Sequence, residues 1–299
     1  MKTVKLGTAD VKVSAFCLGT MRFGWGTDTA MSYRLLDMYV DAGGSFLDTA
    51  NIYGRREGQR VGAISEMLLG DWMRERRNRS DIFVATKVGF SYVGTEAGLR
   101  ASQVVDECEK SLQRLGTDTI DLFYAHVDDR ETPMEETLDA FDRLIKAGKV
   151  RYIGASNFLA WRLEEARWTS LSNAWAAYCC IQQRHSFVRP KPGASFGAQI
   201  VANDDLLDYC RARGLTVLAY SPLLSGAFTR PDRPFAPQYA GPDTDARVSA
   251  LASVAGELSA TLNQVVLAWM VQNDPLVIPL VAASTIEQME ENLGGLELT

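Results

Sequence analysis

The sequence predicts an α/β fold of the (β/α)8 TIM-barrel class, preceded by a short N-terminal β-hairpin. Short β-rich runs alternate with longer helical patterns from one end of the chain to the other, and eight such strand–helix units fit within 299 residues. Parallel strands joined by helices close into a barrel at about this chain length. A doubly wound sheet is the second candidate, but no G-x-G-x-x-G motif follows any expected strand.

The expected barrel strands are short apolar runs separated by longer segments. They span residues 13–19, 45–48, 82–87, 120–126, 152–155, 177–182, 216–220 and 277–281. Between them, apolar residues recur at helical spacing, as at Val104, Cys108, Leu112 and Leu115, a run that Gly116 is expected to terminate. No linker or internal repeat divides the chain, so residues 1–299 are expected to form a single barrel domain.

Three local patterns complete the prediction of the fold. Residues 4–6 and 11–13, separated by a Gly-Thr-Ala-Asp turn, predict a hairpin beneath the barrel. Residues 134–145 predict a helix with Thr132 as its N-cap and Pro133 as its first residue. The basic cluster at residues 74–79 is typical of the last turn of a helix, where positive charge complements the helix dipole.

Composition and charge narrow the class of protein. The net charge is −6 and the basic residues are scattered, which argues against nucleic-acid binding. No apolar run approaches the ~20 residues that cross a bilayer, and no signal peptide is recognised. Five cysteines without C-x-x-C spacing predict free thiols in the cytoplasm, and two histidines make a histidine-rich zinc site improbable, so no metal is expected. The expected partner is a small molecule, and the oligomeric state is left open.

Four polar residues stand at or just beyond the ends of consecutive expected strands: Asp48, Tyr53, Lys87 and His126. Such strand ends converge on one mouth in a barrel, so the four side chains are expected to meet. Reduction of a carbonyl group needs an oxygen that is polarised and then protonated. Tyrosine, with an ordinary pKa of about 10, becomes a useful acid beside a cation such as Lys87, which Asp48 would orient. His126 would donate a hydrogen bond to the carbonyl oxygen. Taken singly, each residue also fits a structural role: a helix cap, a pocket wall, a solvated strand end or a core histidine.

The segments that contain these residues resemble those of the aldo-keto reductase superfamily. Residues 46–54 (FLDTANIYG) are similar to the D-T-A-x-x-Y-G segment of that family. Residues 85–87 (ATK) and 124–129 (YAHVDD) then resemble its T-K and H-x-x-D elements, in the same order. Residues 144–158 (LIKAGKVRYIGASNF) resemble its G-K-x-R-x-I-G-x-S-N stretch, and the similarity continues to Asn292.

The resemblance implies a binding site for NADP(H), with NAD(H) as the alternative. In the family a Ser-Asn pair and a glutamine bind the nicotinamide carboxamide, and a tyrosine stacks on the nicotinamide ring. These residues match Ser156, Asn157, Gln182 and Tyr220. Gln183 is the alternative to Gln182 should the strand register differ by one. The implied cofactor contacts are Gly19, Thr20, Met21, Asp48, Ser156, Asn157, Gln182, Tyr220, Ser221, Leu223, Gly226, Ser284, Gln288, Glu291 and Asn292. The implied substrate contacts are Trp25, Tyr53, Phe90 and His126.

Two positions depart from the family pattern. Where members often have a basic residue for the 2′-phosphate, this chain has Ser284 and Thr285, so discrimination between the two cofactors is expected to be weak. His185 stands where related subfamilies have tyrosine, and a packing role is expected for it. Three Gly- and Pro-containing segments, residues 89–98, 189–197 and 229–244, are expected to form the rim of the mouth, the last also folding over the cofactor.

The function implied is NAD(P)H-dependent reduction of an aldehyde or ketone on a small molecule, sugar-like compounds included, and the reverse oxidation. One alternative is a non-catalytic cofactor-binding regulatory subunit of the channel β-subunit type, which has the same fold. A second is a barrel lyase or aldolase in which Lys87 forms a Schiff base.

Overall fold

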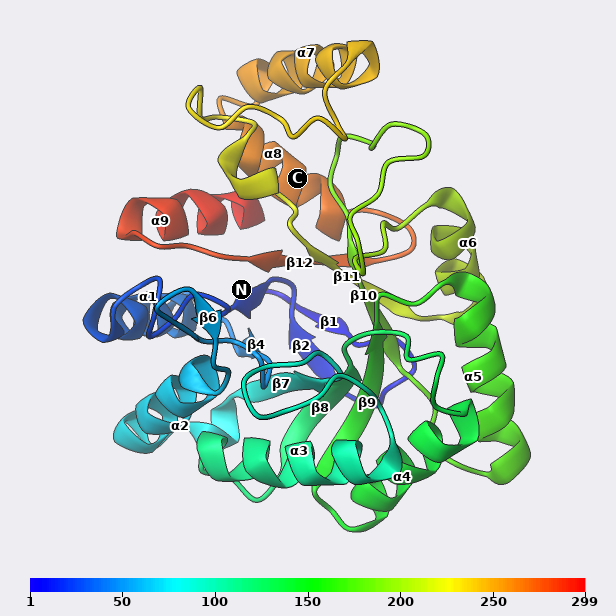
Figure 1. Cartoon of the computed structure of the whole chain (residues 1–299). Coiled ribbons are helices and arrows are strands. Elements are labelled where there is room, and N and C mark those ends of the chain that lie inside the picture. The colour runs from blue at the N-terminus through cyan, green and yellow to red at the C-terminus, as the bar shows by residue number, and fades with distance from the viewer. Residues whose placement is uncertain (299) are drawn as a thin grey trace.

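The computed structural model describes residues 1–298, and a closed barrel of parallel strands lies at its centre (Figure 1). The barrel strands are β3 (Cys17–Gly19), β4 (Phe46–Asp48), β7 (Phe83–Val88), β8 (Ile120–Ala125), β9 (Val150–Ser156), β10 (Cys180–Arg184), β11 (Thr216–Tyr220) and β12 (Val277–Val281). Their order around the barrel follows their order in the sequence, and β12 closes the ring against β3. The predicted (β/α)8 class is therefore confirmed.

The helices surround the barrel (Figure 1). They are α1 (Thr29–Asp41), α2 (Ile64–Arg76), α3 (Ala101–Leu115), α4 (Met134–Lys146), α5 (Ala160–Asn173), α6 (Asp204–Arg213), α7 (Pro242–Glu257), α8 (Leu262–Val271) and α9 (Ile286–Gly294). The apolar face predicted for α3 is buried, and Gly116 ends that helix with a φ of 63°, in the left-handed region that favours glycine. Among residues 1–298, no single helix is long and apolar enough to cross a membrane. The helices α7 and α8 together have the required length and apolar composition, but they meet at an angle of 94°.

The first expected strand, residues 13–19, is in fact two strands. Its beginning belongs to β2 (Lys12–Ser14), which pairs antiparallel with β1 (Thr3–Lys5), and its end is β3 of the barrel. Ser14 marks the bend, because its hydroxyl donates to the carbonyl oxygen of Phe16 and accepts from the backbone N–H of Phe46. Ser14 is the one hydroxyl-bearing residue in the expected strand, but its position alone did not distinguish a bend from a continuous strand, since the residues on both sides of it are buried.

The prediction for the start of α4 was also wrong by one residue. Pro133 occupies the N-cap position with extended backbone, and Met134 is the first helical residue. The hydroxyl of Thr132 donates instead to the carboxylate of Asp129, at 2.7 Å.

The sixth expected strand, residues 177–182, lies slightly later in the chain, at β10. The free thiols were predicted correctly, because all the cysteines are unpaired and buried.

The N-terminal hairpin closes the bottom of the barrel, as predicted. The backbone N–H of Gly7 in its turn donates to the hydroxyl of Thr216, the first residue of β11, at 2.7 Å. Gly7 has a φ of 53°, and a Cβ there would lie 1.8 Å from the carbonyl oxygen of Cys179. Leu6 and Val13 are fully buried and pack with the side chains that fill the barrel. The turn therefore requires glycine to bring the hairpin against the strand starts.

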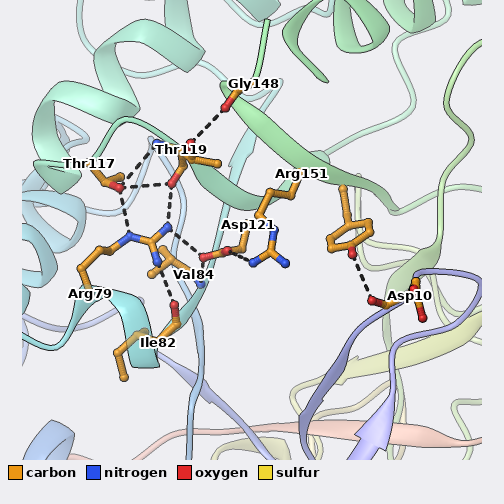
Figure 2. Close-up of polar contacts among 10 residues, drawn as sticks. Asp10, Arg79, Ile82, Val84, Thr117, Thr119, Asp121, Gly148 and Arg151 are labelled. Carbon is orange, nitrogen blue, oxygen red and sulfur yellow. Dashed lines mark hydrogen bonds and ion pairs between the residues drawn. The ribbon is translucent and has the colours of Figure 1, made fainter. Parts of the chain in front are cut away.

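An ionic network joins neighbouring strands at the same end of the barrel (Figure 2). The carboxylate of Asp121, at the start of β8, accepts from the backbone N–H of Val84 at 2.9 Å and from two guanidinium groups. Arg79 and Arg151 each lie 2.8 Å from it. The Asp121 side chain is only 5% exposed, so its charge depends on these partners rather than on water.

Replacement of Asp121 by asparagine is expected to reduce the free energy of unfolding by roughly 2–3 kcal/mol. This loss of stability lies at or below the lower end of the range measured when one partner of a buried ion pair is removed, because both arginines keep partial contact with water. Chemical denaturation measures the change. The turnover number should be unaffected, since barrel enzymes react at the opposite end; an equal loss of turnover would contradict this separation.

Candidate functional site

The predicted catalytic residues meet at the carboxyl ends of β4, β7 and β8. Asp48 is the last residue of β4, Lys87 lies near the end of β7, and His126 directly follows β8. Tyr53 is on the segment after β4. The ammonium group of Lys87 contacts a carboxylate oxygen of Asp48, the carbonyl oxygen of Thr49 at 2.6 Å and the Tyr53 hydroxyl at 3.4 Å. Residues up to 78 positions apart in sequence thus share one small volume because the strand ends converge.

Lys87 and Asp48 form an ion pair that is almost completely removed from water. Their side chains are 0% and 1% exposed. Burial alone lowers the pKa of the Lys87 ammonium, but the charge and hydrogen bond of Asp48 outweigh it, so the net pKa is raised and the lysine stays charged. Gln182 gives Asp48 a second partner, because its amide donates to the other carboxylate oxygen at 2.8 Å. The lysine is therefore both charged and fixed in direction.

Tyr53 holds its proton at neutral pH. Burial raises the pKa of its phenol, and the Lys87 ammonium opposes that rise. Lys87 also lies 5.0 Å from the centre of the Tyr53 ring. The tyrosine is thus a neutral acid with a cation beside the oxygen that would become negative after proton loss.

His126 is buried and neutral. Burial lowers the pKa of its imidazole well below the ordinary value, and the charges of Lys87 and Arg60 lower it further. Its ring lies 6.1 Å from that of Tyr53 and 4.7 Å from that of Phe90, edge to face in both cases. Its Nδ1 atom is buried and has no hydrogen-bond partner among residues 1–298. A neutral imidazole here keeps one N–H for a hydrogen bond to a polar ligand.

The neighbouring strands contribute amide and hydroxyl groups to the same volume. Gln182 faces Asp48, whereas the Gln183 amide donates outward to the carbonyl oxygen of Phe158 at 2.9 Å. In this strand register Gln182, and not Gln183, faces Asp48. Ser156, at the end of β9, is buried and accepts from the Asn157 amide at 3.1 Å.

Asn157 uses its whole side chain to join parts of the site. Its amide nitrogen donates to the carbonyl oxygen of His126 at 2.9 Å. Its amide oxygen accepts from the Tyr220 hydroxyl at 2.7 Å and from the backbone N–H of Ile200 at 3.1 Å. The residue has a φ of 61°, which asparagine tolerates better than most side chains do. The Tyr220 ring is consequently held toward Asn157.

The segment after β11 has an unusual backbone conformation. Ser221, Leu224 and Ser225 have φ values of 55°, 47° and 62°, and Gly226 has 91°. Three successive residues, 224–226, are thus left-handed, and turns that contain left-handed residues can expose backbone N–H groups to an anion. Leu223 lies within this turn and accepts from the Gly226 N–H at 2.9 Å.

The segment at the start of α9 is connected to the one after β11. Asn263 of α8 donates to Thr229 at 3.1 Å and to Glu291 at 3.2 Å. Thr285 is the N-cap of α9, and the backbone N–H of Ser284 donates to Gln288 at 2.8 Å. The remaining predicted contact, Asn292, is buried and donates to the carbonyl oxygen of Ala282 at 3.1 Å. These polar side chains order the loop that follows β12.

The first predicted segment lies next to Asp48. The Thr20 hydroxyl donates to the Asp48 carbonyl oxygen at 3.0 Å, and Gly19, which ends β3, pairs with Asp48. The Trp25 indole donates to the carbonyl oxygen of Met21 at 2.7 Å, and Met21 is exposed. Trp25 is half-buried there, on the segment that follows β3.

Two of the three predicted rim segments contact each other. The backbone N–H of Lys191 donates to the carbonyl oxygen of Gln238 at 2.7 Å, and the Gln238 amide donates to the carbonyl oxygen of Ser195 at 3.4 Å. Residues 242–244 were expected to belong to the loop, but they form the first turn of α7, which begins at Pro242.

The packing role predicted for His185 is confirmed, because its ring stacks on Trp269 at 5.6 Å and burial lowers its pKa to about 4.

Sequence reasoning missed Arg60. A small exposed hairpin, β5 (Arg55–Arg56) and β6 (Gln59–Arg60), follows Tyr53 and places Arg60 close enough to lower the pKa of His126. Its guanidinium donates to the carbonyl oxygen of Ser91 at 3.4 Å and has no carboxylate within ion-pair distance among residues 1–298. The Glu57-Gly58 turn, with left-handed φ values of 50° and 79°, was the available signal.

Known proteins resemble this chain over its whole length. A family model described as the aldo/keto reductase family matches residues 15–299. An uncharacterized oxidoreductase, YrpG, of Bacillus subtilis is 31% identical, covering 100% of this chain and 92% of its own. The aldo-keto reductase str7 of Strobilurus tenacellus is 34% identical over 88% of this chain and 75% of its own. Norsolorinic acid reductase A of Aspergillus parasiticus is 29% identical over 97% and 76%.

Proposed function

The chain belongs to the aldo/keto reductase family, and we propose from this premise that it reduces an aldehyde or ketone on a small molecule to an alcohol, with NADP(H) as cofactor. The reverse oxidation uses the same groups. The observation that carries the proposal is the buried Lys87–Asp48 pair with the Tyr53 hydroxyl 3.4 Å from the lysine nitrogen. A neutral histidine lies beside the same tyrosine.

The residues around this group fit a nicotinamide dinucleotide. Ser156 and Gln182 offer the hydroxyl and amide groups that a carboxamide requires, Asn157 joins them by exchanging one of its present bonds, and Tyr220 offers an aromatic face. The left-handed turn after β11, with Ser221, Leu223 and Gly226, would hold the pyrophosphate through the Ser221 hydroxyl and through backbone N–H groups that the turn does not already use, the Gly226 N–H being bonded to Leu223. The start of α9, with Ser284 and Gln288, offers a helix N-terminus to the adenosine phosphate. The bound cofactor supplies the hydride.

The protein groups polarise the carbonyl and deliver the proton. His126 donates a hydrogen bond to the carbonyl oxygen through its neutral imidazole. Tyr53 transfers its phenolic proton to the same oxygen as negative charge develops there. Lys87 stabilises the phenolate that remains, and Asp48 keeps the ammonium group oriented. In the oxidation direction the phenolate of Tyr53 accepts the alcohol proton.

Aromatic side chains beside the mouth favour flat or aromatic carbonyl compounds as substrates. Phe90 packs against His126, and Trp25 lies on the segment that follows β3. One similar protein is named a norsolorinic acid reductase. The direct test follows NADPH absorbance with a panel of benzaldehydes, aryl ketones, cyclic ketones and ketosugars. Consumption of NADPH with formation of the alcohol supports the proposal. Cofactor binding without turnover on any class would support a regulatory subunit instead.

A modest preference for NADPH over NADH is expected, with a kcat/KM ratio of about 10. Ser284 and Thr285 donate hydrogen bonds to a 2′-phosphate without charge, whereas a charged donor contributes about 1.5–3 kcal/mol. Arg230 pairs with Asp232 at 2.6 Å on the surface, so part of its charge is already compensated before a phosphate binds. Steady-state kinetics with one substrate and both cofactors provide the ratio. A ratio at or below one contradicts the preference, and a ratio in the thousands requires a basic contact that these residues do not provide.

The two reaction directions are expected to depend differently on pH. Reduction requires protonated Tyr53, whose pKa is raised above its ordinary value, so kcat/KM for reduction should be constant from pH 6 to about 9. Oxidation requires the phenolate and should rise about tenfold per pH unit over the same range. The pKa of His126 lies well below its ordinary value, so no change is expected near pH 6.5. A decline in reduction below pH 7 would show that His126 titrates there.

A further inference from the structure

A second buried polar network lies behind the mouth, outside the group that contacts substrate. Its centre is the carboxylate of Glu107 on α3, which is 2% exposed. The amide of Asn51 donates to this carboxylate at 2.8 Å, and the hydroxyl of Tyr92 donates to it at 2.9 Å. Asn51 lies between Asp48 and Tyr53, and Tyr92 follows Phe90 on the rim segment at residues 89–98. One carboxylate thus binds two segments of the mouth.

The network continues to the strand that contains Lys87. Arg114 donates to the Tyr92 hydroxyl at 3.2 Å and to the buried carboxylate of Glu66 at 2.6 Å. Glu66 in turn accepts from the hydroxyl of Thr86 at 2.6 Å, and Thr86 directly precedes Lys87 in β7. The segments on which Tyr53, Phe90 and Lys87 lie are therefore all connected through α2 and α3.

The charges of the network balance, which allows it to be buried. Glu66 and Glu107 both form ion pairs with Arg114. The ammonium nitrogen of Lys110 forms a further ion pair with a carboxylate oxygen of Glu107, at 2.7 Å. Burial raises the pKa of Glu107, but the hydrogen bonds from Lys110, Asn51 and Tyr92 outweigh it, so the net pKa is lowered and the carboxylate stays charged. A charged acceptor makes stronger and shorter bonds than a neutral one.

We propose that Glu107 is a positioning residue for the reductase: its carboxylate holds the Asn51 and Tyr92 segments together, and so sets the position of Tyr53 relative to Lys87 and His126. This inference rests on the proposed function. The 3.4 Å contact between Lys87 and Tyr53 leaves little tolerance, and displacement by about 1 Å can reduce turnover 100-fold. The backbone of the Asn51 segment is bonded to β7, where the Asn51 N–H donates to the Lys87 carbonyl oxygen at 3.3 Å, and the bond of its side chain to Glu107 adds the link to α3.

Two variants and one matched control test the role. Glu107→Gln keeps the shape of the side chain, but a single amide oxygen cannot accept from all three donors, Asn51, Tyr92 and Lys110. We therefore expect kcat to fall about 10- to 100-fold, with the Kd for NADPH within about twofold. Tyr92→Phe removes one hydroxyl and should lower kcat about three- to tenfold. Asp121→Asn, the control, breaks a buried ion pair of similar size at the floor and should lower stability without lowering kcat. A fall in kcat no larger than that of Asp121→Asn would overturn the proposal.

Hydrogen exchange gives a readout that does not depend on turnover. In Glu107→Gln, peptides covering residues 49–54 and 89–98 should exchange faster together, although they lie far apart in sequence, while the floor strands stay protected. In Asp121→Asn the pattern should be reversed. Unchanged exchange in both mouth peptides would contradict the inference even if the wild-type enzyme is active. An inactive wild-type protein contradicts the proposed function alone, because the exchange pattern still tests the network.

Discussion

Replacement of Tyr53 by phenylalanine is expected to lower kcat for carbonyl reduction by about 100-fold or more, the magnitude associated with general acid catalysis. The substitution removes the only proposed proton donor and keeps the ring that packs near His126. Affinity for NADPH should change little, because the hydroxyl is bonded to Lys87 rather than to a proposed cofactor contact. Single-turnover kinetics and fluorescence titration separate these two quantities.

Tyr124 offers a matched control for this experiment. Its ring also faces Lys87, 5.8 Å from the ammonium nitrogen, but its hydroxyl lies deep in the barrel against Cys180. Tyr124→Phe also removes one tyrosine hydroxyl near Lys87, but one that contacts Cys180 and not the lysine, and it should leave kcat within about threefold of the wild type. Near-normal turnover in Tyr53→Phe, or equal losses in both variants, would contradict the assignment of the acid.

Replacement of Lys87 by methionine is expected to abolish measurable reduction and to reduce the free energy of unfolding by about 3–5 kcal/mol. Turnover is lost because the Tyr53 phenolate no longer has a cation beside it. Stability is lost because Asp48, 1% exposed, would remain buried without its counter-charge. Chemical denaturation and NADPH consumption measure the two effects on the same samples.

The double variant Asp48→Asn with Lys87→Met separates the two roles. Removal of both charges should restore most of the lost stability, because a neutral pair of similar volume needs no counter-ion, while turnover stays absent. In Lys87→Met alone, burial keeps the pKa of Asp48 above its unfolded value, so the carboxyl gains stability by protonation as pH falls. The stability deficit should therefore shrink from pH 8 to pH 5. A deficit independent of pH would mean that lost packing, rather than buried charge, is responsible.

The sequence predicted the site better than it predicted the boundaries of the fold. Asp48, Lys87 and His126 were placed together because parallel strands end at one edge of a barrel, so only the strand order was needed. The division of residues 13–19 between two sheets was not foreseen, because both halves are apolar and buried. Periodicity reports burial, and it does not report the sheet to which a buried residue belongs.

The network around Glu107 shows a different limit. A glutamate on an amphipathic helix is normally solvated, and its burial becomes favourable only when its carboxylate has partners. Lys110 and Arg114 supply charge from the next turns of α3, but Asn51, which lies 56 positions away, and Tyr92 come from other segments. Such a cluster is visible only once the packing of α2 and α3 against the barrel is known.

The hairpin at the floor closes one end of the barrel. Leu6 and Val13 fill that end, and the side chains above them, among them Phe46 and Leu122, are fully buried. Within the described residues, 1–298, the floor therefore offers bulk water no path to Tyr53 through the barrel. In the proposed reduction, the proton that restores the Tyr53 phenol must then arrive by the mouth from which the alcohol departs, so slow release of the product would also delay reprotonation of Tyr53.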